Sequence, residues 1–442
     1  MTRPITIACD RAELVVECAT AAATIGLSVA PRLEAQALTA EPGSATGEPV
    51  GIALVEAPSP EDLVRLSAAP GNNSRVVLCI LAGAASTLNF ARDLGLVAVT
   101  DPAALVGALA LAAADRTDAG HATLRGLSEV DRVRLGAAVQ PERGGGSLVR
   151  GDHGLIAHRG EDGVEVTIGS PGDAAAALGA LSGATRSKVR GRSILEGVDP
   201  TAVHDVIFGP PRALSDPASK AALNPYGVPL PLEELCTSPS RAAAEAARLG
   251  FPVRIGLASP DLRVWDHPDL AVDGVDNAAR VRDVFRQMMT LAKTRAPEAR
   301  LLGVTVTATT TARAFMRLVA TPLPERLVRM EVGFADPHGV ASGDSTITAL
   351  PASISQIERV LSRLAGRELI LAGGPAERRA TVEAVADVLL RVAAFVDDRR
   401  DEIESVEIDP LAVLIGGGAE VREACVTVGD AFLRSLEAGA AG

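Results

Sequence analysis

Short apolar runs alternate with alanine-rich helical runs over the first 116 residues, and this alternation constrains the fold more than any other feature of the chain. Strand-like runs followed by helix-like runs occur at 5–9 and 12–26, 51–55 and 58–68, 75–81 and 86–95, and 96–99 and 101–114. The alternation favours a parallel sheet with helices on both faces. Ser59 and Asp101 precede helical runs and are expected to be helix N-caps.

The remaining sequence predicts further domains, because 442 residues are too many for one hydrophobic core. Residues 1–116 are expected to form a flavodoxin-like domain. Residues 117–210 contain glycine-rich loops, a predicted hairpin at 147–168 and helices at 128–138 and 173–181, and are expected to be a small α+β segment of unknown role. Residues 211–442 read as one α/β block. Its expected helices are 239–249, 275–294, 353–365 and 376–397, and its expected strands are 252–258, 302–308, 326–333, 345–350 and 404–414.

Composition excludes several kinds of partner. With 43 basic and 55 acidic residues the formal charge is −12, which argues against nucleic acid and anionic membranes. Aromatic residues make up only 2%, too few for base-stacking platforms. The longest apolar stretch, 104–114, is too short to span a bilayer.

The cysteines and the N-terminus indicate a cytoplasmic protein. Five cysteines lie far apart without a C-x-x-C pair, which is typical of buried, reduced thiols. The first residues, MTRPITIACDRAEL, lack the apolar core and cleavage site of a signal peptide.

Residues 214–430 resemble the ATP-grasp part of the NDP-forming acyl-CoA synthetases, the family that includes acetate–CoA ligase. The stretches that carry the resemblance are LSDPASKAALNPYGVPLP (214–231), AAAEAARLGFPV (242–253), ASPDL (258–262), LLGVTV (301–306) and VEIDPLAVL (406–414). The resemblance implies a C-terminal ATP-grasp-like domain of two lobes over 211–442, preceded by the flavodoxin-like domain that fused members carry. The CoA-binding domain of that family has no counterpart here.

The positions that the resemblance assigns to phosphate recognition are altered. The strand lysine of the family is replaced by Gly256. Arg254, two residues earlier on the same strand face, or Lys220, brought from elsewhere, are the candidates to replace it, although a guanidinium is longer than an ammonium and planar. A basic pair and a glycine pair follow in the family; the residues in these places are Val264, Trp265, Asp269 and Leu270.

The position that binds the nucleotide sugar in the family is substituted, whereas acidic residues remain at the metal positions. Phe315 stands near the hinge glutamate that binds the nucleotide sugar in the family, and Thr348 stands in place of an arginine. Asp344 fits the family's aspartate and is a candidate for the nucleotide cleft. The resemblance also implies Mg²⁺ ligands at Glu407, Asp409 and Glu423.

Glu407 and Asp409 also have a simpler explanation. Being two residues apart on a strand, they are expected to point to one face, with Pro410 ending the run. A solvated strand end with an Asp-Pro turn is the alternative to a residual cation site. Similarly, Trp265 is either an interface anchor or a core residue, and RSKVRGR (186–192) is either a solvated loop or a contact for an acidic partner.

The sequence leaves two functions open. The first is a pseudoenzyme that lacks a nucleotide cofactor and serves as a scaffold, structural or regulatory subunit in a protein complex or homo-oligomer. The second is an active ADP-forming acyl-CoA ligase subunit that binds ATP and Mg²⁺ and needs a partner chain for CoA binding. A phosphorylation-type receiver is not expected, because Asp10 stands alone and Asp101-Pro102 replaces the required lysine.

Overall fold

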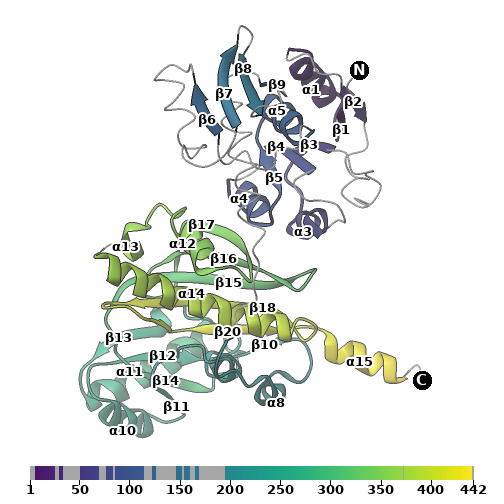
Figure 1. Ribbon diagram of the computed structural model, residues 1–442. Coiled ribbons are helices and arrows are strands. Elements are labelled where there is room, and N and C mark those ends of the chain that lie inside the picture. Colours follow the sequence, from purple (N-terminus) through teal and green to yellow (C-terminus); the bar gives the residue numbers. More distant parts are fainter. Residues whose placement is uncertain are drawn as a thin grey trace. The chain divides into compact units, whose positions relative to one another are not determined.

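The computed structural model describes residues 5–24, 29–32, 50–68, 76–82, 85–113, 122–125, 146–151, 154–159, 165–168, 195–371 and 373–440. The chain divides into two compact units, Met1–Arg190 with Leu323–Glu325, and Gly191–Pro322 with Arg326–Gly442. They are called unit 1 and unit 2 and are described separately (Figure 1). The three-part division expected from the sequence, with boundaries at 116 and 210, stays a prediction.

Unit 1 contains a parallel five-stranded sheet in the order β2-β1-β3-β4-β5. Its strands are β1 (Ile5–Cys9), β2 (Val29–Arg32), β3 (Val50–Glu56), β4 (Val76–Ala82) and β5 (Val97–Val99), and its helices are α1 (Ala12–Thr24), α3 (Pro60–Ala68), α4 (Ala85–Asp93) and α5 (Pro102–Ala113). All eight expected elements are present, and only β2 was not predicted. The order is that of doubly wound sheets such as flavodoxin's.

Both expected N-caps of unit 1 are confirmed. The Ser59 hydroxyl accepts a hydrogen bond from the backbone N–H of Asp62 at 3.1 Å, at the start of α3. The Asp101 carboxylate accepts from Ala103 and Ala104 at 2.8 and 3.1 Å, at the start of α5. These bonds satisfy amides that the first helical turn leaves without an intrahelical partner.

A second sheet in unit 1 has the order β6-β7-β8-β9. Its strands are β6 (Ala122–Arg125), β7 (Gly146–Gly151), β8 (Gly154–Arg159) and β9 (Glu165–Ile168). β7 and β8 form an antiparallel pair, which confirms the predicted hairpin. The helices expected at 128–138 and 173–181, and the basic stretch 186–192, lie outside the described residues.

The first part of unit 2, which we call the small lobe, is an antiparallel sheet in the order β11-β14-β12-β13 with two helices. Its elements are β11 (Glu233–Cys236), α10 (Pro239–Leu249), β12 (Val253–Ala258), a 3-10 turn at Pro268–Leu270, β13 (Ala271–Val275), α11 (Ala278–Arg295) and β14 (Gly303–Ala308). Ser238 and Asn277 cap the two helices through their side chains. The lobe has its own hydrophobic core, which includes Ile255, Phe285 and Val306.

The large lobe of unit 2 is built on the sheet β10-β20-β18-β15-β16-β17, with β19 added to β18. Its strands are β10 (Arg212–Ala213), β15 (Ala312–Leu323), β16 (Leu327–Ala335), β17 (Ala341–Leu350), β18 (Ile403–Leu414), β19 (Ala419–Val421) and β20 (Ala424–Val428). Its helices are α8 (His204–Ile207), α9 (Asp216–Leu223), α12 (Ile354–Leu361), α13 (Glu368–Leu371), α14 (Pro375–Asp398) and α15 (Ala431–Ala440), with 3-10 turns at Pro200–Val203 and Asn224–Tyr226.

Pro410 does not end its strand, contrary to the sequence expectation. β18 runs from Ile403 to Leu414, and its pairing with β15 shifts register between Met316 and Leu318. On the other side β20 pairs up to Ile408, and β19 takes over from Leu411. Because proline has no N–H for the ladder, the irregularity at 409–410 lets a central strand contain it.

Two further expectations concern burial and membranes. All five cysteines are free and buried, as predicted. Among the described residues, no helix combines the length and hydropathy needed to cross a bilayer.

The core of the large lobe depends on an aromatic contact beneath α14. Phe395 is fully buried and meets the Tyr226 ring edge-on, with centroids 5.3 Å apart. Truncation of Phe395 to alanine should lower the free energy of unfolding of unit 2 by about 3–5 kcal/mol, because the transfer and cavity terms add. Urea unfolding measures this. Leu369, 54% exposed on α13, is the matched control: its alanine variant should stay within about 0.5 kcal/mol of the wild type, and an equal loss in both variants would contradict the assignment.

Candidate functional site

Three ion pairs join the small lobe to the large lobe. They are Lys220–Glu233 at 2.6 Å, Arg254–Glu423 at 3.0 Å and Arg263–Glu407 at 3.2 Å. Each contains at least one residue that the sequence singled out for the nucleotide cleft or the metal site. The candidate site is therefore a set of direct charge contacts between the two lobes.

Arg254, on β12, lies at the centre of these contacts and is only 3% exposed. One terminal nitrogen donates to Asp273 Oδ2 of β13 and the other to Glu423 Oε1, both at 3.0 Å. Burial opposes the charge, but the two carboxylates outweigh it and raise the pKa of Arg254. Its guanidinium is thus held by two carboxylates, one from each lobe.

Gly256 faces the same carboxylate as Arg254, which confirms that the two share a strand face. A Cβ at Gly256 would lie 3.2 Å from Glu423 Oε1 and 3.2 Å from Thr305 Oγ1. A side chain here would enter space that Glu423 occupies. The position that carries a lysine in the family therefore adjoins the carboxylate that Arg254 now neutralises.

Lys220 lies on α9, one helical turn after Asp216, so the two side chains share one face of the helix. Its Nζ donates to Asp216 at 2.9 Å and to Glu233 at 2.6 Å. Burial works against the ammonium, yet Asp216, Glu233 and Glu423 together raise the pKa of Lys220. Lys220 does reach the inter-lobe region, but it donates to carboxylates of the chain itself.

The charged cluster between the lobes contains more acids than bases. It comprises the two cations Lys220 and Arg254 and the four acids Asp216, Glu233, Glu423 and the exposed Asp273. Burial raises the pKa of Glu423 to about 7 and that of Asp216 to about 6, and the cations only partly offset it. Near neutral pH these acids therefore hold protons part of the time, which reduces the excess of negative charge.

Glu407 and Asp409 point to one face of β18, as the sequence predicted. A single guanidinium, that of Arg317 on β15, reaches both: its terminal nitrogen lies 3.6 Å from Glu407 Oε2 and its Nε 3.4 Å from Asp409 Oδ2. Arg263 approaches Glu407 from the small lobe. Two arginines thus occupy the surroundings of the carboxylates expected to bind a metal.

Asp409 is deeply buried, so the alternative of a solvated strand end is wrong for this residue. It is 1% exposed, and neither carboxylate oxygen makes a hydrogen bond. Burial raises the pKa of Asp409 to about 7, and Arg317 offsets only part of that effect. A buried carboxyl without hydrogen bonds is costly when charged, which is a feature more typical of functional sites than of structural ones.

The third expected metal ligand, Glu423, contacts Asp409 through a backbone hydrogen bond, and its side chain pairs elsewhere. Its carbonyl accepts from the Asp409 N–H at 3.1 Å, while its carboxylate pairs with Arg254. Within the described part of the chain, no group of three or more His, Cys, Asp or Glu side chains has the arrangement of a metal site.

Asp344 makes its hydrogen bonds away from the inter-lobe cluster. Its two carboxylate oxygens accept from the backbone N–H groups of Ala365 and Gly366 at 3.0 and 2.8 Å. The residue therefore fixes the loop after α12 to β17. Its expected role in a nucleotide cleft stays a prediction.

The positions that depart from the family have structural contacts of their own. Val264 is buried, and the Arg263 guanidinium lies over the half-buried Trp265 ring at 5.8 Å. Asp269 is paired bidentately with Arg295, both bonds 2.7 Å long. The Arg422 guanidinium covers the Phe315 ring at 4.9 Å. None of the substituted residues Val264, Trp265, Asp269 and Phe315 is itself a cation that could hold a phosphate.

Little room remains between the lobes beside the cluster. A small, partly open pocket there is lined by residues that include Asp216, Glu423, Arg263 and Trp265. The conformation described is therefore closed around its own ion pairs.

Five charged residues of this site were not found from the sequence: Asp216, Glu233, Arg263, Asp273 and Arg317. The sequence around these residues carries no motif that marks them. The alternation of buried and half-buried residues in β15, which contains Arg317, is visible only in the structure.

The inter-lobe pair Arg254–Glu423 should be strongly coupled energetically. Replacing either partner alone, R254M or E423Q, should lower the free energy of unfolding by about 3–5 kcal/mol, because it removes the inter-lobe partner of a buried charge. The double variant should recover much of that loss. Urea unfolding of the four proteins gives the coupling energy. The matched control is the exposed pair Arg286–Asp283, whose coupling should stay below about 1 kcal/mol; equal coupling in both cycles would refute the assignment.

Asp409 should make stability depend on pH. Its pKa is about 7 in the folded chain against an ordinary 3.8, so between these values the folded chain binds a proton that the unfolded chain has released. The stability that protonation of Asp409 contributes is fully present below pH 3.8, and it is lost as the pH rises towards 7. The stability gain of D409N over wild type should therefore grow between about pH 5 and about pH 8.

Urea unfolding across that pH range measures this effect. Glu404, exposed on the same strand, provides the control variant E404Q. A pH-independent difference between D409N and wild type would show that Asp409 is charged throughout.

Comparison with known proteins shows which family the C-terminal half of the chain resembles. Residues 209–428 match the family model described as ATP-grasp domain. The acetate–CoA ligase [ADP-forming] II subunit beta of Pyrococcus furiosus is 24% identical over 223 residues, which are 50% of this chain and 94% of that protein. The corresponding I subunit beta is 22% identical over 206 residues, 45% of this chain and 85% of that protein. A solved structure of dinucleotide forming acetyl-coenzyme A synthetase 1 from Ca. Korarchaeum cryptofilum is 19% identical, covers 49% of this chain and 94% of its own, and has a TM-score of 0.44.

Proposed function

We propose that the ATP-grasp domain of this chain no longer turns over nucleotide. The premise is that residues 209–428 are an ATP-grasp domain related to the beta subunits of ADP-forming acetate–CoA ligases. The chain then acts as a pseudoenzyme, a scaffold, structural or regulatory subunit within a protein complex. The observation that carries the proposal is that Arg263 and Arg317 form ion pairs with the carboxylates expected to hold the metal.

The carboxylate pair does not fit a Mg²⁺–nucleotide complex as arranged. Mg²⁺ needs closely spaced oxygens in near-octahedral geometry and usually keeps several waters. Arg317 lies within 3.6 Å of both Glu407 and Asp409, and Arg263 lies 3.2 Å from Glu407. A divalent ion would have to displace both guanidinium groups, which repel it.

The phosphate side supports the same proposal. Catalysis of phosphoryl transfer depends on cationic groups and backbone amides positioned around the phosphates. Arg254 and Lys220 each contact two carboxylates instead. Releasing either cation towards a phosphate would leave buried carboxylates without a partner, at a cost of several kcal/mol.

A second candidate is an active ADP-forming acyl-CoA ligase subunit that uses ATP and Mg²⁺ and takes its CoA-binding part from a partner chain. One observation favours it: both oxygens of the buried Asp409 lack hydrogen bonds, as expected for a carboxylate that awaits a ligand. The names of the relatives, which are beta subunits of acetate–CoA ligases, point the same way. This function requires the lobes to open and Arg317 to withdraw.

The rest of the chain enters the same proposal. The parallel order β2-β1-β3-β4-β5 supports a flavodoxin-like domain at residues 1–116, of the kind that precedes the ATP-grasp part in fused members. Five free, buried cysteines support a reducing, cytoplasmic location. The expected protein partner or second copy can be sought by native mass spectrometry.

Thermal denaturation of the full chain with and without ATP·Mg²⁺ separates the two functions. The pseudoenzyme should show no shift at millimolar nucleotide, whereas a ligand at 100 times its Kd would add about 2.7 kcal/mol. D409N is the matched control, since it removes the candidate metal ligand. A shift in the wild type that D409N abolishes, together with ATP-dependent acyl-CoA formation, would overturn the pseudoenzyme proposal.

A further inference from the structure

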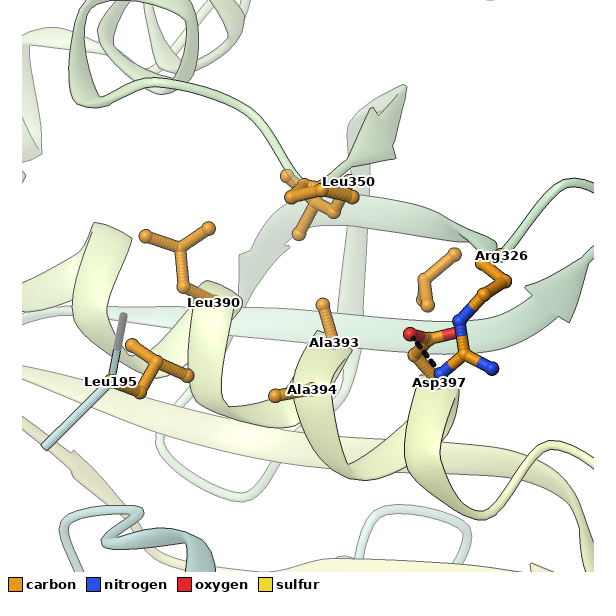
Figure 2. A pocket seen from close by; sticks show the side chains of 9 residues that line it. Leu195, Arg326, Leu350, Leu390, Ala393, Ala394 and Asp397 are labelled. Atoms are coloured by element: carbon orange, nitrogen blue, oxygen red, sulfur yellow. Dashed lines mark hydrogen bonds and ion pairs between the residues drawn. The ribbon is translucent and has the colours of Figure 1, made fainter. Parts of the chain in front are cut away.

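A second pocket lies in the large lobe, beside the C-terminal half of α14, and we call it the α14 pocket. Its empty volume of about 400 Å³ includes space that is open to solvent. Figure 2 shows Leu390, Ala393 and Ala394 on α14, with Leu350 above them and Leu195 below Leu390 in this view. Val328 and Pro351 complete the apolar lining. None of these residues belongs to the inter-lobe cluster.

Among the described residues that line this pocket, the charged ones are at one end. They are Arg326, from the turn between β15 and β16, and Asp397, from the last turn of α14. The Arg326 guanidinium donates to Asp397 Oδ2 at 2.9 Å, the dashed contact in Figure 2. The pocket therefore has an apolar body and one polar end, the form of a site for an amphiphilic molecule.

The charged groups at that end of the pocket determine whether an anionic or a cationic ligand group fits there. Asp397 is 7% exposed, and both of its oxygens are used, one by Arg326 and the other by Arg400 at 2.9 Å. The Arg326 side chain, in contrast, is 60% exposed and has five N–H donors, of which those on one nitrogen face Asp397 at 2.9 Å and Asp398 at 3.9 Å. The accessible group is thus a donor, and it suits an anion better than an amine.

The backbone at Arg326 is held in a conformation that its residue type disfavours. Its φ is 55°, in the left-handed region that costs a side chain with a Cβ free energy. A hairpin turn would ordinarily place asparagine or glycine there. Strain of this kind concentrates at ligand sites, where the surrounding structure maintains it.

We propose that the α14 pocket binds an aliphatic monocarboxylate, with its hydrocarbon chain along Leu390, Ala393 and Leu350 and its carboxylate on Arg326. A guanidinium and a carboxylate form charge-assisted hydrogen bonds, and Asp397 keeps Arg400 as a partner when Arg326 turns to the ligand. This inference goes beyond the proposed function and does not rest on it, because the two sites share no residue.

Isothermal titration of the full chain with butanoate, hexanoate and octanoate tests the proposal. Each added methylene that enters the pocket should tighten binding about fourfold. The variant A394F, which fills the pocket from a half-buried helix position, should abolish octanoate binding. Absence of saturable octanoate binding at millimolar concentration, or equal binding by A394F, would overturn the proposal.

Variants at Arg326 test the carboxylate contact separately. Asparagine tolerates the left-handed conformation, so R326N removes the charge without adding backbone strain, and R326K keeps the charge. R326N should bind octanoate about tenfold or more weakly, R326K should retain most of the affinity, and all three proteins should bind the neutral probe octanol alike. A loss of octanol binding in R326N, or unchanged octanoate binding, would contradict the role of Arg326. Either result is independent of whether ATP·Mg²⁺ binds.

Discussion

The arrangement of unit 2 depends on one buried guanidinium. Arg254 leaves the small-lobe sheet and reaches Glu423 in the large lobe while it keeps Asp273 of its own lobe. In a medium of low dielectric such a charge must be paired on all sides, so the positions of the two carboxylates follow from it. The two lobes have separate hydrophobic cores, and this contact helps to fix how the lobes meet.

The same constraint explains why the excess of acids is tolerated. Four carboxyl groups surround two cations, and burial of Asp216 and Glu423 shifts their pKa values to about 6 and about 7. Protons therefore complete the charge balance near neutrality.

The α14 pocket arises from a different cause. Helix α14 presents the small side chains Ala393 and Ala394 where its neighbours are leucines, and small residues leave room that a larger side chain would fill. Its charged end is an ion pair with an exposed arginine instead of a buried network. The two sites thus differ in the property that decides ligand binding: one is closed by paired charges, the other open with a donor to spare.

The sequence by itself determined the elements and the family. Strand–helix alternation predicted the first sheet, except for the four-residue β2, and the caps Ser59 and Asp101, because these depend on neighbours in sequence. The stretch around Glu407 and Asp409 correctly indicated a shared face and ATP-grasp ancestry. What it could not determine was the partner of each charge. Arg254 and Glu423 are 169 residues apart and Arg263 and Glu407 are 144 apart, so only the tertiary structure decided that the carboxylates expected to bind a metal face arginines, since Coulomb energy depends on distance in space and not on position in the chain.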